Sequence, residues 1–384
     1  MTGTHQVSGR ASAVRNGDAG RVSAGGPREA GSAGHGTLTV AVIGGGQSPE
    51  HDVSLASAAA IGQALAEAGH RVIPMTIARD ATWRFSGETV SPWAAIDELR
   101  RCDLVFPALH GRRGEDGSIA AFCRIAGVPF VGSGVAAGAA GMDKWLTKLV
   151  AESVGIRTAR SVLLHRNDQG DVGGTVPGPR SVALPGPGLP VVVKPASAGS
   201  SYGVSLVRRP DELAPAMSRA FAFDRRVLVE EYVVGREIDI AVLGMRDGSR
   251  DTAPALEILP TEAGVFDLAT KYDGTARFVV PAPLGEAQRA SLRSAAIALF
   301  DALGCSGVVR VDFFLTSHGL VLNEVNTMPG FTEHSQVPRM FAAAGISYRD
   351  LVDLMARDAL DRSTMTARRT CFDGAMAAMA GDST

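Results

Sequence analysis

The chain opens with a strand–helix–strand order of apolar positions. A β-branched stretch at Thr37–Ile43 predicts a buried strand, and three glycines (44–46) separate it from a helical spacing at about Val53–Ala68. The pattern further predicts strands at Arg71–Ile77 and Leu104–Leu109 and a helix at Ser118–Ile125. This order is typical of a parallel sheet, so we expect an N-terminal α/β domain over residues 37–141.

Strands outnumber helices in the two units that follow, residues 142–235 and 236–362. The central unit is predicted to contain a helix near Met142, strands at Ser161–Leu164, Pro190–Lys194, Gly203–Val207 and Val227–Glu231, and a helix at Asp211–Phe221. The C-terminal unit is predicted to contain strands at Ile238–Leu243, Val308–Leu315 and Leu320–Val325 and a helix at Glu286–Ala302. The Gly- and Pro-rich stretch His165–Leu189 is expected to be an exposed loop. The fold class is therefore α/β and α+β.

Composition adds few constraints. The 384 residues are 45% hydrophobic and 20% charged, and 38 basic residues nearly balance 40 acidic ones. This balance favours a small-molecule partner over nucleic acid or a membrane surface. The four cysteines show no metal-ligand spacing. Residues 1–36 are expected to be a disordered extension without a signal sequence, and residues 363–384 a loosely held tail.

A hairpin of two apolar strands within Gly307–Gly330 carries the most informative polar residues. Arg310 and Asp312 share one face of the first strand, and Glu324 and Asn326 share one face of the second. Two carboxylates and an amide are hard oxygen ligands, which suits Mg²⁺. The alternative is a salt bridge from Arg310 to Asp312 or Glu324, although four polar groups exceed what one bridge needs.

A second polar stretch, Pro190–Gly203, begins with a buried strand that delivers Lys194. The small residues Gly199, Ser200 and Ser201 follow, and their N–H groups are able to wrap phosphate oxygens. Taken alone, such a loop is more often an ordinary turn. Only four of the 38 basic residues are lysines (Lys144, Lys148, Lys194 and Lys271), which favours a requirement for a compact point charge at those positions.

Several motifs, in this order, resemble a known family. VVVKP, GSSYG, VLVEEYVVGRE, RVDFFL and NEVNTMPG are similar to the ATP-grasp superfamily, in which two α+β units clamp ATP. GGGQSPEHDVSLAS, LHGRRGEDGSIAAFCRIAGVPFVGSG, TKYDGTARF and MPGFTEHS narrow the resemblance to D-alanine–D-alanine ligases, over residues 37 to about 360. The resemblance implies an ATP-grasp fold behind the N-terminal parallel-sheet domain. It also implies ATP-dependent joining of two D-alanines through a D-alanyl phosphate, for peptidoglycan precursor synthesis.

The resemblance assigns nucleotide and metal residues. Lys144 and Lys194 match the lysines on the ATP phosphates, and Lys271 one that reaches the transferred phosphate. The remaining nucleotide positions are Ser200 and Ser201 in the phosphate loop, Glu230, Glu231 and Val233 beside the adenine, and Glu237 at the ribose. Asp312, Glu324 and Asn326 match the ligands of two Mg²⁺ ions, for which Mn²⁺ can substitute.

Substrate residues follow from the same resemblance. Glu50 matches the anchor of the first D-alanine's ammonium, His110 faces the same pocket, and Ser335 matches the group that holds the second D-alanine's carboxylate. Arg310 and the Gly330 N–H match an oxyanion site, and Glu50, Ser200 and Tyr272 match a hydrogen-bonded trio that ties down a lid loop. Gln336, where Leu or Met is more usual, borders the second-substrate subsite and leaves its selectivity open.

Other functions remain to be weighed. D-alanine–D-lactate ligases typically carry His at the position of Tyr272, which argues against that activity, whereas a D-alanine–D-serine ligase is harder to exclude because of Gln336. An antibiotic-resistance copy of the enzyme and a catalytically inactive ATP-binding protein are further alternatives. The family also implies a homodimer in the cytoplasm.

Overall fold

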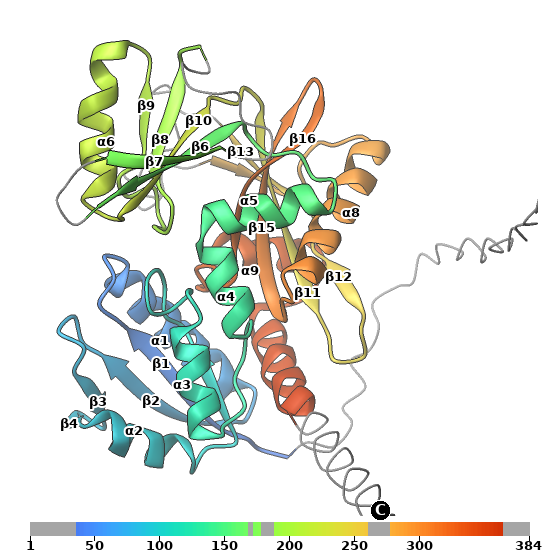
Figure 1. Ribbon diagram of the computed structural model, residues 1–384. Helices are drawn as coiled ribbons and strands as arrows, with labels where there is room; N and C mark the ends of the chain where they lie inside the picture. The colour runs from blue at the N-terminus through green and yellow to red at the C-terminus, as the bar shows by residue number, and fades with distance from the viewer. Residues whose placement is uncertain (1–35, 168–171, 178–187, 260–276, 364–384) are drawn as a thin grey trace, which may run out of the picture. The chain divides into compact units, whose positions relative to one another are not determined.

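Three β-sheets organise the computed structural model, which describes residues 36–167, 172–177, 188–259 and 277–363 (Figure 1). The predicted extension over residues 1–36 lies outside the described residues except for Gly36, and the predicted tail does so after residue 363. Lys271 and Tyr272 also lie outside them. Among the described residues, no helix has the length and apolar character that crossing a membrane requires.

The N-terminal sheet confirms the predicted parallel pairing of its central strands, whereas its two three-residue strands pair antiparallel. Its strands, in the order β4-β3-β2-β1-β5, are β4 (Glu88–Val90), β3 (Trp83–Phe85), β2 (Arg71–Ile77), β1 (Thr39–Gly45) and β5 (Leu104–Pro107). β1 pairs in parallel with β2 and β5, and α1 (His51–Glu67) connects β1 to β2. The sequence pattern did not predict β3 and β4, whose three residues each are too short to show a period.

Both faces of this sheet are buried. Successive side chains of β1 point to opposite sides of the sheet, and each side packs in a core of its own. Val40 and Val42 pack in a core that includes residues of α1 and of the C-terminal helical residues 348–363. Ala41 and Ile43 pack on the other side against α2 (Pro92–Leu99) and α3 (Ser118–Ala126). The C-terminal helical residues therefore return to cover the N-terminal sheet.

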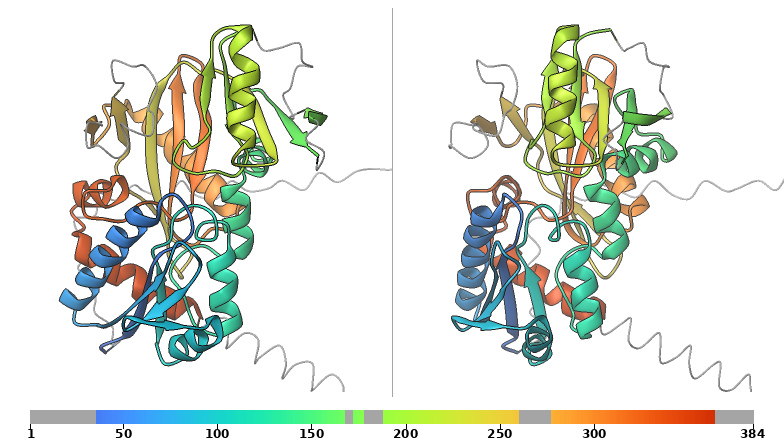
Figure 2. Two further views of the ribbon diagram at one scale, coloured as in Figure 1. Left: turned by 90° about the vertical axis from the view of Figure 1, so that its left-hand side faces the viewer. Right: turned by 60° about the vertical axis from the view of Figure 1, so that its left-hand side comes forward.

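The second sheet is antiparallel throughout. Its strands, in the order β7-β6-β10-β8-β9, are β7 (Val172–Pro177), β6 (Ser161–Arg166), β10 (Arg226–Glu231), β8 (Val191–Pro195) and β9 (Ser205–Val207). Figure 2 shows α6 (Leu213–Phe221), which follows the short 3₁₀ turn Pro210–Glu212, lying across one face. The prediction of a loop without elements over His165–Leu189 is wrong, because β7 lies within it. β7 is an edge strand with two glycines that pairs with β6, so its sequence shows little alternation.

Two helices replace the single helix predicted near Met142. α4 (Val135–Met142) and α5 (Lys144–Ser153) meet at Asp143, whose carboxylate accepts hydrogen bonds from the N–H groups of Trp145 and Leu146. An aspartate in this N-cap position satisfies amide groups that the helix itself leaves unpaired. Lys144 is consequently fixed at the first position of α5, with its own N–H donating to Ala196 O beside β8.

The third sheet has one apolar face and one face that is partly charged and partly apolar, with Leu243 and Val308 in the same core as Val40. Its strands, in the order β14-β13-β11-β15-β16, are β14 (Arg277–Val279), β13 (Leu256–Leu259), β11 (Arg236–Gly244), β15 (Gly307–Thr316) and β16 (Gly319–Asn326), with β12 (Arg250–Thr252) also paired to β11. The predicted hairpin of β15 and β16 is confirmed. Ile238, Val309 and Val311 share one face with α8 (Glu286–Ala302), which has the predicted bounds. The other face carries the charged residues that the sequence singled out.

The three sheets fall within the predicted ranges 37–141, 142–235 and 236–362, which we retain as proposed domains. Packing cuts across these ranges in one place. α9 (Gln336–Ala343) and residues 348–362 belong to the last range, but Phe341 and Leu351 pack in the same core as β1.

Candidate active site

The polar face of the third sheet is set by strand register. Asp239 on β11 lies directly opposite Asp312 on β15, and Asp312 lies opposite Glu324 on β16. Arg310 lies opposite Asn326 in the same pair of strands. Residues two apart on a strand share a face, so these five side chains project together.

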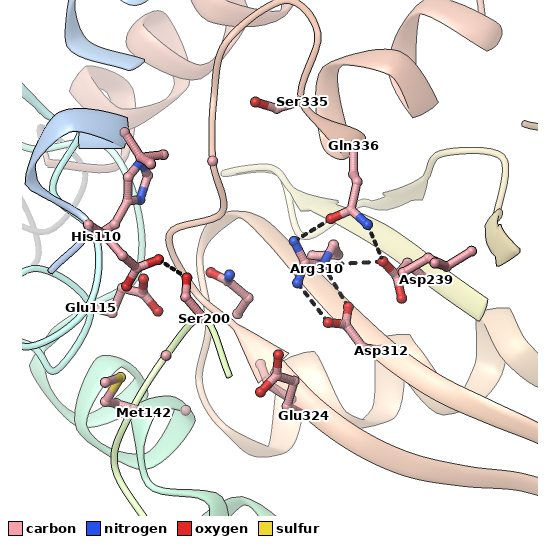
Figure 3. A pocket seen from close by; sticks show the side chains of 18 of the residues that line it. His110, Glu115, Met142, Ser200, Asp239, Arg310, Asp312, Glu324, Ser335 and Gln336 are labelled. Carbon is pink, nitrogen blue, oxygen red and sulfur yellow. Dashed lines mark hydrogen bonds and ion pairs between the residues drawn. The ribbon is translucent and has the colours of Figure 1, made fainter. Parts of the chain in front are cut away.

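Arg310 is the centre of this face (Figure 3). Its Nε and Nη2 donate to the two carboxylate oxygens of Asp312, both at 2.7 Å, and its Nη1 donates to Gln336 Oε1 at 2.8 Å. Burial lowers the pKa of Arg310, but the carboxylates of Asp312 and Asp239 outweigh it and raise the pKa overall. The salt bridge weighed as an alternative in the sequence is therefore present. This salt bridge does not include Glu324 or Asn326, so it does not account for their presence on the same face.

Asp312, Glu324 and Asn326 fit a hard divalent cation by their chemistry. Glu324 Oε2 lies 3.3 Å from Lys144 Nζ, and Asn326 Oδ1 accepts from Met328 N at 3.0 Å. Each carboxylate oxygen has more than one lone pair, so these contacts leave room for metal coordination. Among the described residues, no three His, Cys, Asp or Glu side chains are arranged to hold a metal ion by themselves, and the third oxygen ligand expected here is the amide of Asn326.

The opposite side of the site is built from loops. Ser200 Oγ donates to the carboxylate of Glu50, so two members of the predicted trio are in contact. Ser200 and Ser201 have φ of +46° and +58°, a left-handed conformation that side chains seldom adopt. A Cβ at Gly199 would lie 3.0 Å from Glu50 Oε2, which explains the small residue at that position.

His110 is buried beside Glu50. Its Nδ1 lies 3.0 Å from Met328 O, so this nitrogen carries the proton and donates, and Nε2, 3.0 Å from Ser57 Oγ, accepts. Burial lowers the pKa of His110, against the opposing charge of Glu50. The neutral imidazole thus joins the N-terminal domain to the strand–loop segment after β16.

Glu115 is a further acid at this end that sequence reasoning did not single out. Its Oε1 accepts from Gly111 N at 2.8 Å. Burial, and next the neighbouring Glu50 carboxylate, raise the pKa of Glu115 to about 8. The residue lies within the quoted HGRRGEDG motif, so the signal was available, but no role was assigned to it.

A buried cluster of two lysines and one glutamate lies near the nucleotide positions. Lys194 pairs with one carboxylate oxygen of Glu230, and Lys148 Nζ lies 2.9 Å from the other. Burial raises the pKa of Glu230, but the two ammonium groups outweigh it and lower the pKa to about 2. Burial lowers the pKa of Lys194. Lys148, the one lysine without an assigned role, is thus a buried partner of Glu230.

The two sides enclose a cavity of about 780 Å³. The predicted residues that line it are Glu50, His110, Lys144, Ser200, Glu237, Arg310, Asp312, Glu324, Asn326, Gly330, Ser335 and Gln336. Glu115 and Asp239 also line it. Charged groups from all three sheets or their connections thus converge on one space, as in an enzyme that handles charged substrates.

Two family models match the chain. The model described as "D-ala D-ala ligase C-terminus" matches residues 153–357, and the one described as "D-ala D-ala ligase N-terminus" matches residues 39–95 and 86–133. The first alone covers more than half of the 384 residues. The chain belongs to the D-alanine–D-alanine ligase family.

Individual relatives agree with this assignment to the D-alanine–D-alanine ligase family. The D-alanine–D-alanine ligase of Corynebacterium efficiens is 38% identical over 361 residues, covering 85% of this chain and 98% of that protein. That of Mycolicibacterium smegmatis is 38% identical over 373 residues, covering 86% and 97%.

Two solved structures show the same fold. The VanG D-Ala:D-Ser ligase from Enterococcus faecalis has a TM-score of 0.72 and 32% identity, and covers 84% of this chain and 100% of its own. The D-alanine–D-alanine ligase from Bacillus anthracis, complexed with ATP, has a TM-score of 0.70 and 27% identity, and covers 86% and 100%. The predicted family and fold class are therefore confirmed.

Not every residue expected from the D-alanine–D-alanine ligase family reaches the cavity. Those outside its lining are Lys194, Ser201, Glu230, Glu231 and Val233. The Glu231 carboxylate instead accepts from the backbone N–H of Arg160 at 2.9 Å and from its Nε at 2.6 Å. A role for Glu231 beside the adenine would therefore rely on its backbone.

Proposed function

We propose that the protein joins two D-alanines into D-alanyl–D-alanine, with ATP converted to ADP and phosphate, through a D-alanyl phosphate. The observation that carries this proposal is the meeting of two sets of groups in one cavity. Arg310, Asp312 and Glu324 on the strands face the Ser200–Glu50 pair on the loops. One set suits phosphate and metal charge, and the other suits an amino acid's ammonium.

In the first step, a carboxylate oxygen of the first D-alanine attacks the γ-phosphorus of ATP and ADP leaves. Glu50 binds the ammonium of this D-alanine, and Lys144, which lines the cavity, offsets phosphate charge. Lys194, which pairs with Glu230 outside the lining, is proposed to exchange this partner for phosphate oxygens. Asp312, Glu324 and Asn326 would hold two Mg²⁺ ions, which supply charge neutralisation when bound. Lys271, outside the described residues, is proposed to reach the transferred phosphate.

In the second step, the amine of the second D-alanine attacks the acyl carbon. Arg310 and the Gly330 N–H bind the oxygen on which negative charge develops, while Ser335 holds the second carboxylate. The carbon–oxygen bond to phosphate then breaks, and the amine releases a proton. The protein's contribution is therefore to position reactants and balance charge, without a covalent enzyme intermediate.

A second candidate is a D-alanine–D-serine ligase. Gln336 lies in the cavity beside Arg310, and the VanG D-Ala:D-Ser ligase is a similar structure. Tyr272 favours D-alanine over D-lactate as the second substrate. A neutral phenol does not repel the ammonium of D-alanine, whereas a cationic imidazole at this position would repel it and leave the neutral D-lactate hydroxyl unaffected. A cytoplasmic homodimer that supplies peptidoglycan precursors is part of the same proposal.

Phosphate release with product identification tests this function. We expect release only when ATP, Mg²⁺ and D-alanine are all present, and D-alanyl–D-alanine as the main product. Equal release with L-alanine, or none with D-alanine, would exclude it. Mixtures of D-alanine with D-serine or D-lactate test the second candidate, which predicts a mixed product at comparable rates. Nucleotide binding without phosphate release would indicate an inactive ATP-binding protein.

A further inference from the structure

Three side chains on one side of the cavity form a closed set of contacts. Arg310 Nη1 donates to Gln336 Oε1 at 2.8 Å, and Gln336 Nε2 donates to Asp239 Oδ2 at 3.0 Å. The same Asp239 oxygen lies 3.6 Å from Arg310 Nε. Figure 3 shows Gln336 reaching down from the start of α9 between the other two. A neutral amide thus connects a cation to an anion through its oxygen and its nitrogen.

The three residues come from separate elements, which the amide ties together. Asp239 is fully buried on β11, and Arg310 is on the neighbouring strand β15. Gln336 is the first residue of α9, a helix anchored in the core through Val337 and Met340. The orientation of the amide is dictated, because its oxygen must face the guanidinium and its NH₂ group the carboxylate.

Gln336 restrains Nη1, the guanidinium nitrogen of Arg310 that Asp312 does not contact. Asp312 holds Nε and Nη2, so without Gln336 the Nη1 end would lack the hydrogen bond that the amide oxygen accepts. In a mechanism that depends on a donor aimed at a developing negative charge, small changes in its placement alter the rate. The same contacts engage both polar ends of Gln336 with protein, which argues against a direct role in recognising a substrate hydroxyl.

We infer that Gln336 and Asp239 are positioning residues for Arg310, so that Gln336 acts on the chemical step and not on the choice of the second amino acid. The inference rests on the proposed function. It assigns to Gln336 a role in positioning Arg310 and no role in selecting the second amino acid.

Steady-state kinetics of Gln336→Leu test it first. Leucine has a similar shape but neither polar atom, so kcat should fall about tenfold to a hundredfold, the effect of losing a hydrogen bond to a charged group. The KM for ATP should stay within about twofold, and the ratio of D-alanine to D-serine incorporation should not change. Gln63→Leu, on the exposed surface of α1, is the matched control and should behave as wild type.

A double variant separates a loss of positioning from a general disturbance of the structure. Gln336→Glu places a second carboxylate beside Asp239, and Asp239→Asn removes the negative charge that faces Arg310 and replaces one of its two acceptor oxygens with an NH₂ donor, so each alone should lower kcat at least about tenfold. When the two substitutions are combined, the new amide at position 239 can donate to the new carboxylate at position 336, which still accepts from Arg310. This exchange restores both the contacts and the net charge. The double variant should therefore recover most of the kcat lost by Gln336→Glu.

The possible outcomes are distinct. No phosphate release by wild type with ATP, Mg²⁺ and D-alanine would overturn the proposed function and this inference with it. An active wild type with unchanged kcat in Gln336→Leu, or with a shifted D-alanine to D-serine ratio, would overturn the inference alone. Failure of the double variant to recover, while its thermal stabilisation by ATP matches that of wild type, would also overturn it.

Discussion

The cavity has one side made of strands and one side made of loops, and the two sides handle charge differently. On the strand side, the Arg310 guanidinium and the Asp312 carboxylate compensate each other's charge through two hydrogen bonds of 2.7 Å. On the loop side, Glu115 and His110 are shifted toward their neutral forms by burial. The strand side thus offers fixed charges for phosphate and metal, whereas the loop side limits charge around Glu50, the carboxylate expected to bind the substrate ammonium.

The two sides also differ in how the chain assembles them. Arg310 and Asp312 are two residues apart on one strand, so their relative position follows from the strand's geometry alone. Ser200 and Glu50 are 150 positions apart, and His110 and Met328 are 218 positions apart. The loop side therefore depends on correct packing of several segments, and substitutions there should affect substrate affinity and stability more than the rate of chemistry.

The largest effect is expected on the strand side. Glu324→Gln keeps the shape of the side chain and removes a charge, so turnover should fall by roughly two or more orders of magnitude. The matched control is Glu286→Gln, whose carboxylate at the start of α8 is 86% exposed. Phosphate release in saturating ATP, Mg²⁺ and D-alanine measures the effect. Near wild-type turnover in Glu324→Gln would mean that the strand side is structural.

A smaller effect is expected at the junction of the two sides. Ser200→Ala removes the hydroxyl that donates to Glu50, and the loss of such a bond should raise the apparent KM for D-alanine about tenfold. Ser153→Ala, at an exposed position in α5, is the control. A fall in kcat at unchanged KM would mean that Ser200 affects the rate of chemistry, as the strand side does, and would contradict the expected difference between the two sides.

A prediction of another kind concerns the pH dependence of stability on the loop side. Because the pKa of Glu115 is raised to about 8, the folded protein keeps a proton that the unfolded chain has released above about pH 4.5. The free energy of unfolding contributed by this group therefore falls as pH rises from about 4.5 to 8. Glu115→Gln removes that dependence, so the variant should gain stability relative to wild type between about pH 5 and 8. Urea unfolding at about pH 5 and about pH 8 measures the free energy of unfolding of both proteins. A difference between them that is the same at both pH values would contradict the raised pKa of Glu115.

Much of this architecture could be predicted from the sequence, for different reasons in different places. β2 and α8 have the predicted bounds. β2 is a short run rich in β-branched residues, and the buried positions of α8 (Leu292, Ala296, Leu299 and Phe300) recur at helical spacing. The polar face of β15 and β16 followed from residues spaced by two. The pairing of Ser200 with Glu50 came only from the family resemblance, since no local pattern links segments so far apart. Asp239 was missed although it follows Glu237 by two residues on β11 and shares its face. Lys148 was singled out among the lysines, but no role was assigned to it because its partner Glu230 lies on another element.

The most direct test of the account follows the oxygen atoms of D-alanine. If a carboxylate oxygen attacks the γ-phosphorus and stays with phosphate when the amine displaces it, D-alanine labelled with ¹⁸O in both carboxylate oxygens transfers one labelled atom per turnover. Mass spectrometry should therefore find one ¹⁸O in each phosphate released and ADP without label, together with one dipeptide per phosphate. Phosphate without ¹⁸O, or label in AMP, would contradict a D-alanyl phosphate and with it the central claim.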